Sequence, residues 1–242
     1  MKTVIMIPAR MAATRLPNKP LVDIAGKPMI QWVYEKSCES IVDAVFIVTP
    51  DEEVAEVARA FGAPVIMTSH AHQTGTDRLA EAVKQLPESV TIIVNVQGDE
   101  PRITAESINS TIYPLIADPD LAMSTLACAL PETAVTDPNT VKVVCKLNQD
   151  ALYFSRSPLP FQRNPGHATS LQHVGLYAYR HWFLVKFPTL VRSPLEQTES
   201  LEQLRALEHG YRIHVVQTST IPESVDTEED LVKVRLLFAQ EK

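Results

Sequence analysis

Near its amino terminus the chain reads Val4-Ile5-Met6-Ile7-Pro8-Ala9-Arg10-Met11-Ala12-Ala13-Thr14-Arg15-Leu16-Pro17-Asn18-Lys19-Pro20. The apolar start of this stretch predicts a short buried β-strand. The loop after it contains three cations, Arg10, Arg15 and Lys19. In an open α/β sheet, ligands bind at the carboxyl ends of strands. Cations that converge there suit a triphosphate, although short basic loops are also ordinary solvated surface.

Apolar, β-rich runs alternate with amphipathic helical segments through the first hundred residues. Strands are expected at residues 3–7, 44–48, 64–67 and 91–96. Their nearly continuous apolar character is typical of a parallel sheet covered on both faces. Helices are expected from Met29 to Ser37 and after Thr49-Pro50-Asp51-Glu52, which has the pattern of a capping box with proline at the first helical position. This order predicts a Rossmann-like, doubly wound α/β fold with a mostly parallel sheet.

From about residue 122 onward, the regular alternation of apolar strands and amphipathic helices ends. Further strands are expected at 126–130, 141–147, 173–179 and 212–217, a loop at 157–166, and helices at 195–207 and 227–239. We expect a single α/β domain, 1–242, in which residues from about 122 to 200 form an inserted lobe. The apolar strands of that lobe need cover, which a two-fold homodimer interface would provide.

Composition narrows the function classes. The chain has 242 residues, 45% of them hydrophobic, and a formal net charge of −7, which disfavours a general nucleic-acid binder. No run is long enough to span a bilayer or to form a signal peptide. Three scattered cysteines favour neither a disulfide framework nor a zinc site. The Rossmann dinucleotide fingerprint and the P-loop are both missing from the sequence. The simplest expectation is a soluble cytoplasmic protein without membrane or nucleic-acid partners.

Two aspartates are candidate metal ligands. Asp99 follows the strand at 91–96, at its carboxyl edge, although Gly-Asp pairs are also common in turns. Asp226 precedes the terminal helix and would by default be its N-cap. However, Thr227 and Asp230 form a capping pair of their own, which would leave the Asp226 carboxylate available. Mg²⁺ is commonly held by one or two carboxylates together with phosphate oxygens.

Other polar residues fit base or sugar recognition. Gln73, with its amide donors and acceptor, could read the edge of a cytosine, although its loop could simply cap a helix. Arg156 follows the apolar Leu152-Tyr153-Phe154 and could hold a carboxylate bidentately. Three further polar residues, Glu202, Tyr177 and His173, could also contact a ligand. Each has an ordinary structural explanation: Glu202 as an exposed charge on a helix, Tyr177 as a core residue and His173 as a structural histidine.

The first loop resembles the nucleotide loop of sugar nucleotidyltransferases. The form Arg-x-x-Ala-Thr-Arg-Leu-Pro-x-Lys-Pro-Leu is similar to that of the CMP-Kdo synthetases, the 3-deoxy-manno-octulosonate (Kdo) cytidylyltransferases. Asn18 stands where glycine is frequent in that family. Six further blocks continue the resemblance in the same order along nearly the whole chain: Asp23–Ile30, His72–Arg78, Val94–Pro101, Leu152–Arg156, Leu201–Arg205 and Val225–Leu231.

The resemblance implies a nucleotide-diphospho-sugar transferase fold and transfer of CMP from CTP to Kdo, for lipopolysaccharide biosynthesis. It implies Mg²⁺ on Asp99 and Asp226, catalytic roles for Arg10, Lys19 and Asp99, and a homodimer whose lobe binds the sugar. The implied nucleotide-binding residues are Arg10, Arg15, Lys19, Gln73, Thr74, Arg78, Gln97 and Asp99. The implied sugar-binding residues are Arg156, His173, Tyr177, Glu202 and Gln203.

Two rivals remain at this point. A cytidylyltransferase for another acidic keto sugar, of the sialic-acid type, would use the same arginine for its substrate's carboxylate. A non-catalytic CTP-binding regulator could have the same sheet, although two metal-type carboxylates are more than a pure binder needs. Release of pyrophosphate from CTP with a panel of acidic sugars would separate all three.

Overall fold

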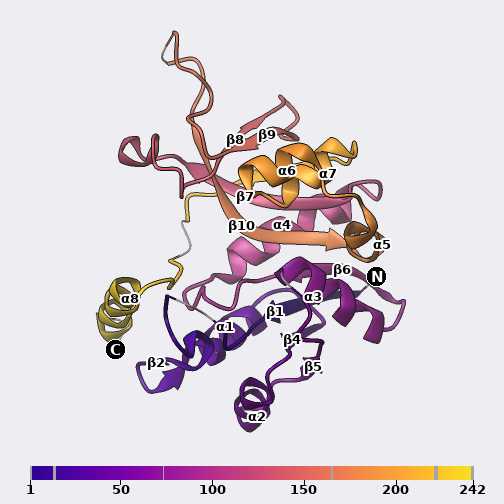
Figure 1. Cartoon of the computed structure of the whole chain (residues 1–242), viewed down its shortest axis with the longest axis vertical. Coiled ribbons are helices and arrows are strands. Elements are labelled where there is room, and N and C mark those ends of the chain that lie inside the picture. Colours follow the sequence, from indigo (N-terminus) through magenta and orange to yellow (C-terminus); the bar gives the residue numbers. More distant parts are fainter. Residues whose placement is uncertain (1, 13–14, 73, 165, 221–222, 241–242) are drawn as a thin grey trace. The chain divides into compact units, whose positions relative to one another are not determined.

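The computed structural model describes residues 2–12, 15–72, 74–164, 166–220 and 223–240 (Figure 1). The chain divides into two compact units. Unit 1 comprises Met1–Asn109 and Pro222–Lys242, and unit 2 comprises Ser110–Ile221. Unit 2 is therefore an insertion into the sequence of unit 1, and each unit is described by itself.

The sheet of unit 1 is parallel. Its strands are β1 (Lys2–Pro8), β4 (Ala44–Thr49), β5 (Val65–Met67) and β6 (Val90–Asn95), which confirms the four predicted runs within a residue or two. Their order is β5-β4-β1-β6, and every adjacent pair is parallel. The chain adds β4 and β5 on one side of β1 and then β6 on the other. The carboxyl ends of β1 and β6 therefore flank the point where the winding reverses, which is where such sheets bind ligands.

Helices and short connections complete unit 1. They are η1 (Lys19–Leu21), the β2–β3 ribbon (Asp23–Ile24 and Lys27–Pro28), α1 (Met29–Cys38), α2 (Glu52–Ala60), α3 (Gly75–Ala82), η2 (Val83–Gln85), the start of α4 (Ala105–Ala117), and α8 (Glu228–Gln240). In α1 the buried residues Met29, Ile30, Val33 and Ser37 recur at helical spacing and form the inward face, as predicted.

The predicted capping box before α2 is wrong. The helix begins at Glu52, and the side chain of its N-cap residue, Asp51, makes no capping hydrogen bond. Instead, the Asp51 carboxylate accepts a hydrogen bond of 2.7 Å from the backbone amide of Met11 in the first loop. The Thr49 hydroxyl accepts one of 3.1 Å from the Asp51 amide. The carboxylate of Asp51 therefore binds the distant Met11 amide instead of an amide at the start of its own helix.

The last helix fixes the carboxyl-terminal segment onto the first loop. In α8, Leu231, Val234 and Phe238 are buried at intervals of three and four residues. They belong to one apolar cluster with Leu16, Ile24, Met29 and Val225. Burial of three such side chains contributes several kcal/mol, at about 1.5–3 kcal/mol each. This packing positions Asp226, which lies between Val225 and the start of α8.

Unit 2 is a mixed arrangement of strands and short helices, and it also contains the larger part of α4. Its strands are β7 (Met123–Ala129), β8 (Lys142–Cys145), β9 (Ala151–Ser155), β10 (Leu171–Arg180) and β11 (Ile213–Gln217). Its helical segments are η3 (Glu132–Ala134), α5 (His181–Lys186), η4 (Phe187–Thr189), α6 (Pro194–Glu199) and α7 (Gln203–Glu208). β7 pairs in parallel with β11 and antiparallel with β10, and β8 pairs antiparallel with β10 and β9.

Two sequence expectations for unit 2 need correction. The strand β9 was not predicted, because Leu152-Tyr153-Phe154 was treated only as part of a motif. The single helix expected at 195–207 is two helices, α6 and α7, which lie side by side in Figure 1. The break occurs at Ser200, whose φ of 53° is left-handed and ends α6.

The expected loop at 157–166 has no helix or strand among its described residues, and in Figure 1 it forms a long arm between β9 and β10. Within the described part of the chain, no helix combines the length and the apolar character needed to cross a membrane.

Candidate active site

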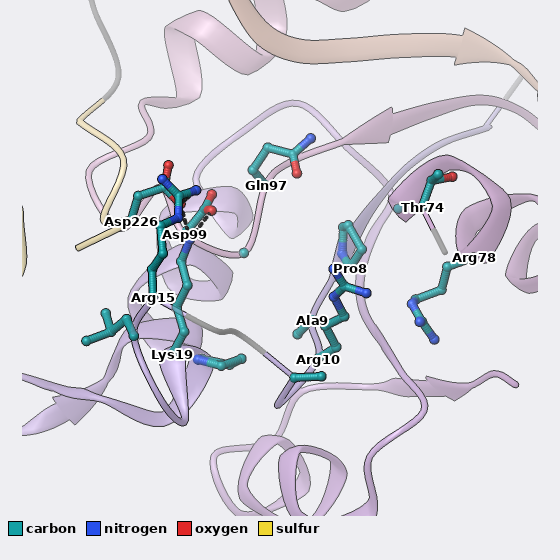
Figure 2. Close-up of a pocket in the computed structure, with 15 residues that line it drawn as sticks. Pro8, Ala9, Arg10, Arg15, Lys19, Thr74, Arg78, Gln97, Asp99 and Asp226 are labelled. Atoms are coloured by element: carbon teal, nitrogen blue, oxygen red, sulfur yellow. Dashed lines mark hydrogen bonds and ion pairs between the residues drawn. The ribbon is translucent and has the colours of Figure 1, made fainter. Parts of the chain in front are cut away.

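A pocket of about 400 Å³ opens at the carboxyl ends of β1 and β6, entirely within unit 1 (Figure 2). Its wall is formed by Pro8, Ala9, Arg10, Ala12, Arg15, Leu16, Lys19, Pro20, Thr74, Gly75, Arg78, Gln97, Gly98, Asp99 and Asp226. Four of these described lining side chains are cationic and two are anionic, although the whole chain carries a charge of −7. The pocket therefore concentrates positive charge, which attracts an anionic ligand.

Lys19 lies between the two predicted metal carboxylates. Its Nζ is 2.5 Å from Asp99 Oδ2 and 2.7 Å from Asp226 Oδ1. Burial acts to lower the pKa of Lys19, but the charges and hydrogen bonds of Asp99 and Asp226 outweigh burial and raise it above its ordinary value. The ammonium is therefore fully charged at neutral pH, and it neutralises part of the charge of the carboxylate pair.

Backbone contacts hold this cluster together. The amide of Val225 donates to the carbonyl of Asp99 at 2.9 Å, which joins the segment before α8 to the end of β6. Asn18, immediately before Lys19, has a φ of 54°. This left-handed conformation explains why glycine is frequent at the position in the resembling family, and asparagine is the non-glycine residue that tolerates it best.

The capping argument for Asp226 is confirmed. Thr227 and Asp230 cap the start of α8 reciprocally: the Thr227 hydroxyl accepts from the Asp230 amide at 3.2 Å, and the Asp230 carboxylate accepts from the Thr227 amide at 2.9 Å. Asp226 is therefore not needed as a cap. Its carboxylate faces the pocket, where Arg15 Nη2 lies 3.4 Å from Asp226 Oδ1 in addition to Lys19.

The opposite wall in Figure 2 carries Thr74 and Arg78, at the start of α3. The Thr74 hydroxyl caps this helix by accepting a hydrogen bond of 3.2 Å from the Asp77 amide. Arg78 is buried and donates from Nη1 to the Thr68 hydroxyl at 2.7 Å and to the Ser69 carbonyl at 3.1 Å. Both residues line the pocket, but each also has a structural task. Gln73 lies outside the described residues.

The remaining predicted nucleotide residues, Arg10 and Gln97, also line the pocket. Arg10 is exposed, and its charge acts with burial, the larger cause, to lower the pKa of Arg78 from its ordinary value. The neighbouring Glu100 is buried, and burial followed by the charge of Asp99 raises the pKa of its carboxyl to about 8. At neutral pH Glu100 is therefore mostly protonated and adds little negative charge beside Asp99.

The predicted sugar residues all lie in unit 2. Arg156 follows β9, and backbone carbonyls hold its guanidinium: Nε donates to Glu199 O and Nη1 to Pro138 O, both at 2.8 Å. The Glu199 carboxylate accepts from the Arg156 amide at 3.0 Å and from the Ser155 hydroxyl at 2.6 Å. The charge of Arg156 acts on the nearby Glu199 carboxylate, but no carboxylate among the described residues lies within ion-pair distance of the guanidinium.

His173 and Tyr177 project from the same face of β10, and their ring centroids are 5.4 Å apart. Burial lowers the pKa of His173 to about 3. Its Nε2 lies 3.0 Å from the Thr125 hydroxyl, which is within donating distance of the carbonyls of Val174 and Leu176. Because the hydroxyl gives its one hydrogen to a carbonyl, it accepts from His173 Nε2–H. Because burial lowers its pKa, the ring is neutral at neutral pH, and with the hydrogen on Nε2 its Nδ1 is an acceptor.

Tyr177 is close to the start of α7. Burial, followed by the charges of Tyr179 and Glu202, raises the pKa of Tyr177 well above its ordinary value. Gln203, beside Glu202 in the sequence, is buried. The structure thus brings the rings of His173 and Tyr177 together, and the charge of Glu202 acts on Tyr177. Arg156 is tied to the same region through Glu199, three residues before Glu202.

Sequence reasoning missed several residues that shape these sites. Gly98 passes so close to β1 that a Cβ atom there would lie 2.8 Å from the Pro8 carbonyl oxygen, so a side chain is excluded. Its place between Gln97 and Asp99 was the available signal. Asp51, which holds Met11, was assigned to a helix end, and Glu199, which holds Arg156, gave no signal because its use depends on tertiary contacts.

Comparison with known proteins identifies the family. A family model described as "Cytidylyltransferase" matches residues 4–213. Two curated proteins named 3-deoxy-manno-octulosonate cytidylyltransferase are similar to the chain. The one from Pseudoalteromonas translucida is 48% identical, with 97% of this chain and 96% of that protein covered. The one from Geobacter metallireducens is 49% identical, with the same coverages.

A solved structure is similar over the full length of both chains, with a TM-score of 0.97 and 45% sequence identity. It is described as CMP:2-keto-3-deoxy-manno-octonic acid synthetase complexed with CTP. This match confirms the predicted nucleotide-diphospho-sugar transferase fold. From its sequence, its fold and its pocket, the chain belongs to the cytidylyltransferase family, in the group of 3-deoxy-manno-octulosonate cytidylyltransferases.

Proposed function

We propose that this chain transfers CMP from CTP to Kdo and releases pyrophosphate. The observation that carries the proposal is the pocket of unit 1, where four cationic side chains and a pair of carboxylates meet at the reversal point of the sheet. Full-length similarity of 48–49% to Kdo cytidylyltransferases supports the same reaction. The anomeric hydroxyl oxygen of Kdo attacks the α-phosphorus of CTP, and the bond from that phosphorus to the oxygen bridging to the β-phosphate breaks. Pyrophosphate leaves with the bridging oxygen, and the hydroxyl proton passes to solvent.

The cations of the first loop have distinct tasks in this reaction. Arg15 is exposed and pairs with Asp226 beside Lys19, so its guanidinium is accessible to the outer phosphates. Arg10 and Lys19 stabilise charge that develops as the α-phosphate is attacked, because fixed cations act most strongly where charge grows in the transition state. Thr74 and Arg78 shape the opposite wall, where a cytosine base would lie. Orientation of the two substrates supplies much of the remaining rate enhancement.

The carboxylate pair fits a magnesium ion. Asp99 and Asp226 both reach the same nitrogen atom of Lys19, so their oxygens converge on one point. Among the described residues, no third His, Cys, Asp or Glu joins them to complete a metal cage. Two hard oxygen donors, with phosphate oxygens and water filling the other positions, suit Mg²⁺. When bound, the ion would lower the pKa of the attacking hydroxyl and screen the phosphates.

Unit 2 would supply recognition of the sugar. Arg156 carries a charge without an ion-pair partner among the described residues and suits the carboxylate of Kdo. His173 offers Nδ1 as an acceptor for a sugar hydroxyl, and Tyr177, Glu202 and Gln203 offer further hydroxyl-binding groups. A sialic-acid type keto sugar carries a similar carboxylate, so it remains the rival substrate.

The decisive test is pyrophosphate release from CTP by the purified chain, with Kdo, N-acetylneuraminate or no sugar, and with or without Mg²⁺. We expect release only with CTP, Kdo and the metal together. Preference for N-acetylneuraminate would replace Kdo with the rival substrate. CTP binding without release with any sugar would make the chain a nucleotide-binding regulator.

We further infer a cytoplasmic homodimer that supplies an activated sugar for lipopolysaccharide. Its substrate CTP is a cytoplasmic metabolite, and apolar side chains such as Trp182 and Leu195 are partly exposed on unit 2. Light scattering at micromolar concentration should give the mass of two chains. A single-chain mass would rule out the dimer without affecting the proposed reaction.

A further inference from the structure

Unit 2 contains a lysine that is completely buried. Lys142 begins β8, between Ser155 of β9 and Gln172 of β10 in the strand register, and none of its surface reaches solvent. No carboxylate of the described residues lies within ion-pair distance of its ammonium. Burying an ammonium in this way is unfavourable, whereas a leucine or methionine would fill the space without that cost. The position therefore needs an explanation beyond packing.

The partners of Lys142 are backbone carbonyls. Its Nζ donates to the carbonyl of Asp137 at 2.6 Å and to that of Arg156 at 3.0 Å. The Arg156 guanidinium in turn donates from Nη1 to the carbonyl of Pro138, the next residue after Asp137. Lys142 thus closes a ring of contacts that runs through Asp137, Pro138 and Arg156. It fixes both the backbone of the arginine and the segment on which its guanidinium rests.

We infer that Lys142 is a positioning residue for Arg156, which it holds in place to receive the carboxylate of the acidic sugar. The inference rests on the proposed function and deepens it. Without the ammonium, the carbonyls of Asp137 and Arg156 lose their common donor. The segment 137–138 and the residue after β9 are then joined by the Arg156–Pro138 hydrogen bond without the support of the ammonium. The guanidinium loses its fixed orientation, while the nucleotide pocket, whose lining residues all belong to unit 1, keeps its own contacts.

The test compares Lys142→Met with a matched control, Arg180→Met. Arg180 is also a buried cation of unit 2 that donates to backbone carbonyls, those of Leu115 and Asp118, at the other end of β10. Both variants should lower the melting temperature. Only Lys142→Met should raise KM for Kdo, by at least about tenfold. Its KM for CTP should stay within about twofold of the wild-type value.

A double-mutant cycle separates positioning from general loosening of unit 2. In an Arg156→Ala background, Lys142→Met should change KM for Kdo by less than about twofold, because the residue that it positions is gone. Additive effects of the two substitutions, or equal effects of the Lys142 and Arg180 variants on KM for Kdo, would overturn the inference.

If Lys142→Met does not fold, Lys142→Arg takes its place. This variant keeps the charge and the donors, but its larger head group displaces the two carbonyls, so KM for Kdo should still rise selectively. An unchanged KM for Kdo in either soluble variant overturns the positioning role. A wild-type chain that releases no pyrophosphate with Kdo overturns the proposed function instead, and this inference with it.

Discussion

Charged side chains are held differently in the pocket of unit 1 and in the sugar-side cluster of unit 2, which comprises Arg156, His173, Tyr177, Glu202 and Gln203. In unit 1, Lys19, Asp99 and Asp226 pair with one another, and their side chains are 15%, 28% and 41% exposed. In unit 2, the guanidinium of Arg156 rests on carbonyls, and Lys142 behind it is fully buried. The first group can exchange partners when a ligand arrives, whereas the second is fixed before any ligand arrives.

This difference suits the two substrates. A triphosphate with a metal ion brings several charges that must be matched at once, and paired side chains near water can be redistributed at little cost. A single carboxylate is best bound by a preoriented arginine, because the conformational entropy of that side chain is then not lost on binding. Substitutions in unit 1 should therefore affect mainly chemistry, and substitutions in unit 2 should affect mainly sugar affinity.

The largest effect is expected from Asp99→Asn and Asp226→Asn. Each removes a charge needed for the metal and should lower kcat by about 1,000-fold or more, with loss of stimulation by Mg²⁺. The fold should survive, because Thr227 and Asp230 cap α8 without Asp226. Pyrophosphate release and melting temperature are the measurements, with the exposed Asp120→Asn as control. An active Asp226→Asn enzyme with a lower melting temperature would make this aspartate structural only.

Lys19→Met should lower kcat by about 100-fold, with a smaller change in KM for CTP. The same substitution should tighten Mn²⁺ binding to the nucleotide-free protein, because the ammonium that now lies between Asp99 and Asp226 is removed. Electron paramagnetic resonance of free Mn²⁺ measures this binding directly. Lys27→Met, which removes a lysine paired with Glu35 at 2.6 Å, should change neither quantity. A raised KM with an unchanged kcat would refute the catalytic role.

The sequence predicted the sheet of unit 1 because its strands follow local patterns. Each of the four strands is a nearly continuous apolar run. The cations of the first loop, Arg10, Arg15 and Lys19, indicate an anion-binding site. The ion-pair partners of Lys19 could not be predicted from local patterns, because Asp99 and Asp226 lie 80 and 207 residues away from it. Their meeting was expected from the family resemblance and not from any local pattern.

Where the sequence misled, a tertiary contact had overridden a local preference. Asp51 lies in a stretch whose sequence is typical of a helix start, but its carboxylate accepts a hydrogen bond from the Met11 amide. Ser200 breaks the expected helix 195–207 without a glycine or proline to mark the break. No element was predicted at 105–117, which forms α4 and contains Pro114. Carbonyl contacts such as those of Arg156 and Lys142 have no signature in sequence, because every residue has a carbonyl.

Arg156→Lys sharpens the comparison at the sugar side. A lysine keeps the charge but cannot hold both the Glu199 and Pro138 carbonyls and still face a carboxylate with two donors. KM for Kdo should rise by about 10- to 100-fold, while KM for CTP stays nearly unchanged. Steady-state kinetics with each substrate varied give both constants. Arg163→Lys, an exposed arginine of the following loop, is the control. Weaker CTP binding with normal Kdo binding would place Arg156 on the nucleotide side.

The smallest expected effect concerns stability and comes from His173. Its pKa of about 3 in the folded chain lies below the ordinary 6.5, so between these values the unfolded chain binds the extra proton. Stability therefore falls as the pH drops below about 6.5 and is fully retained above it. At pH 5 the loss due to this group is at most about 2 kcal/mol, and it is smaller where water reaches the partly exposed residue.

His173→Gln removes this titration while keeping a neutral polar side chain beside Thr125. Urea unfolding at pH 7 and pH 5 should show a smaller loss of stability on acidification for the variant than for the wild type. His167→Gln, at an exposed position, should behave like the wild type. Equal losses in His173→Gln and the wild type would mean that the ring is protonated in the folded chain. In that case the sugar-side cluster would be as open to rearrangement as the pocket of unit 1, and the contrast between the two regions would fail.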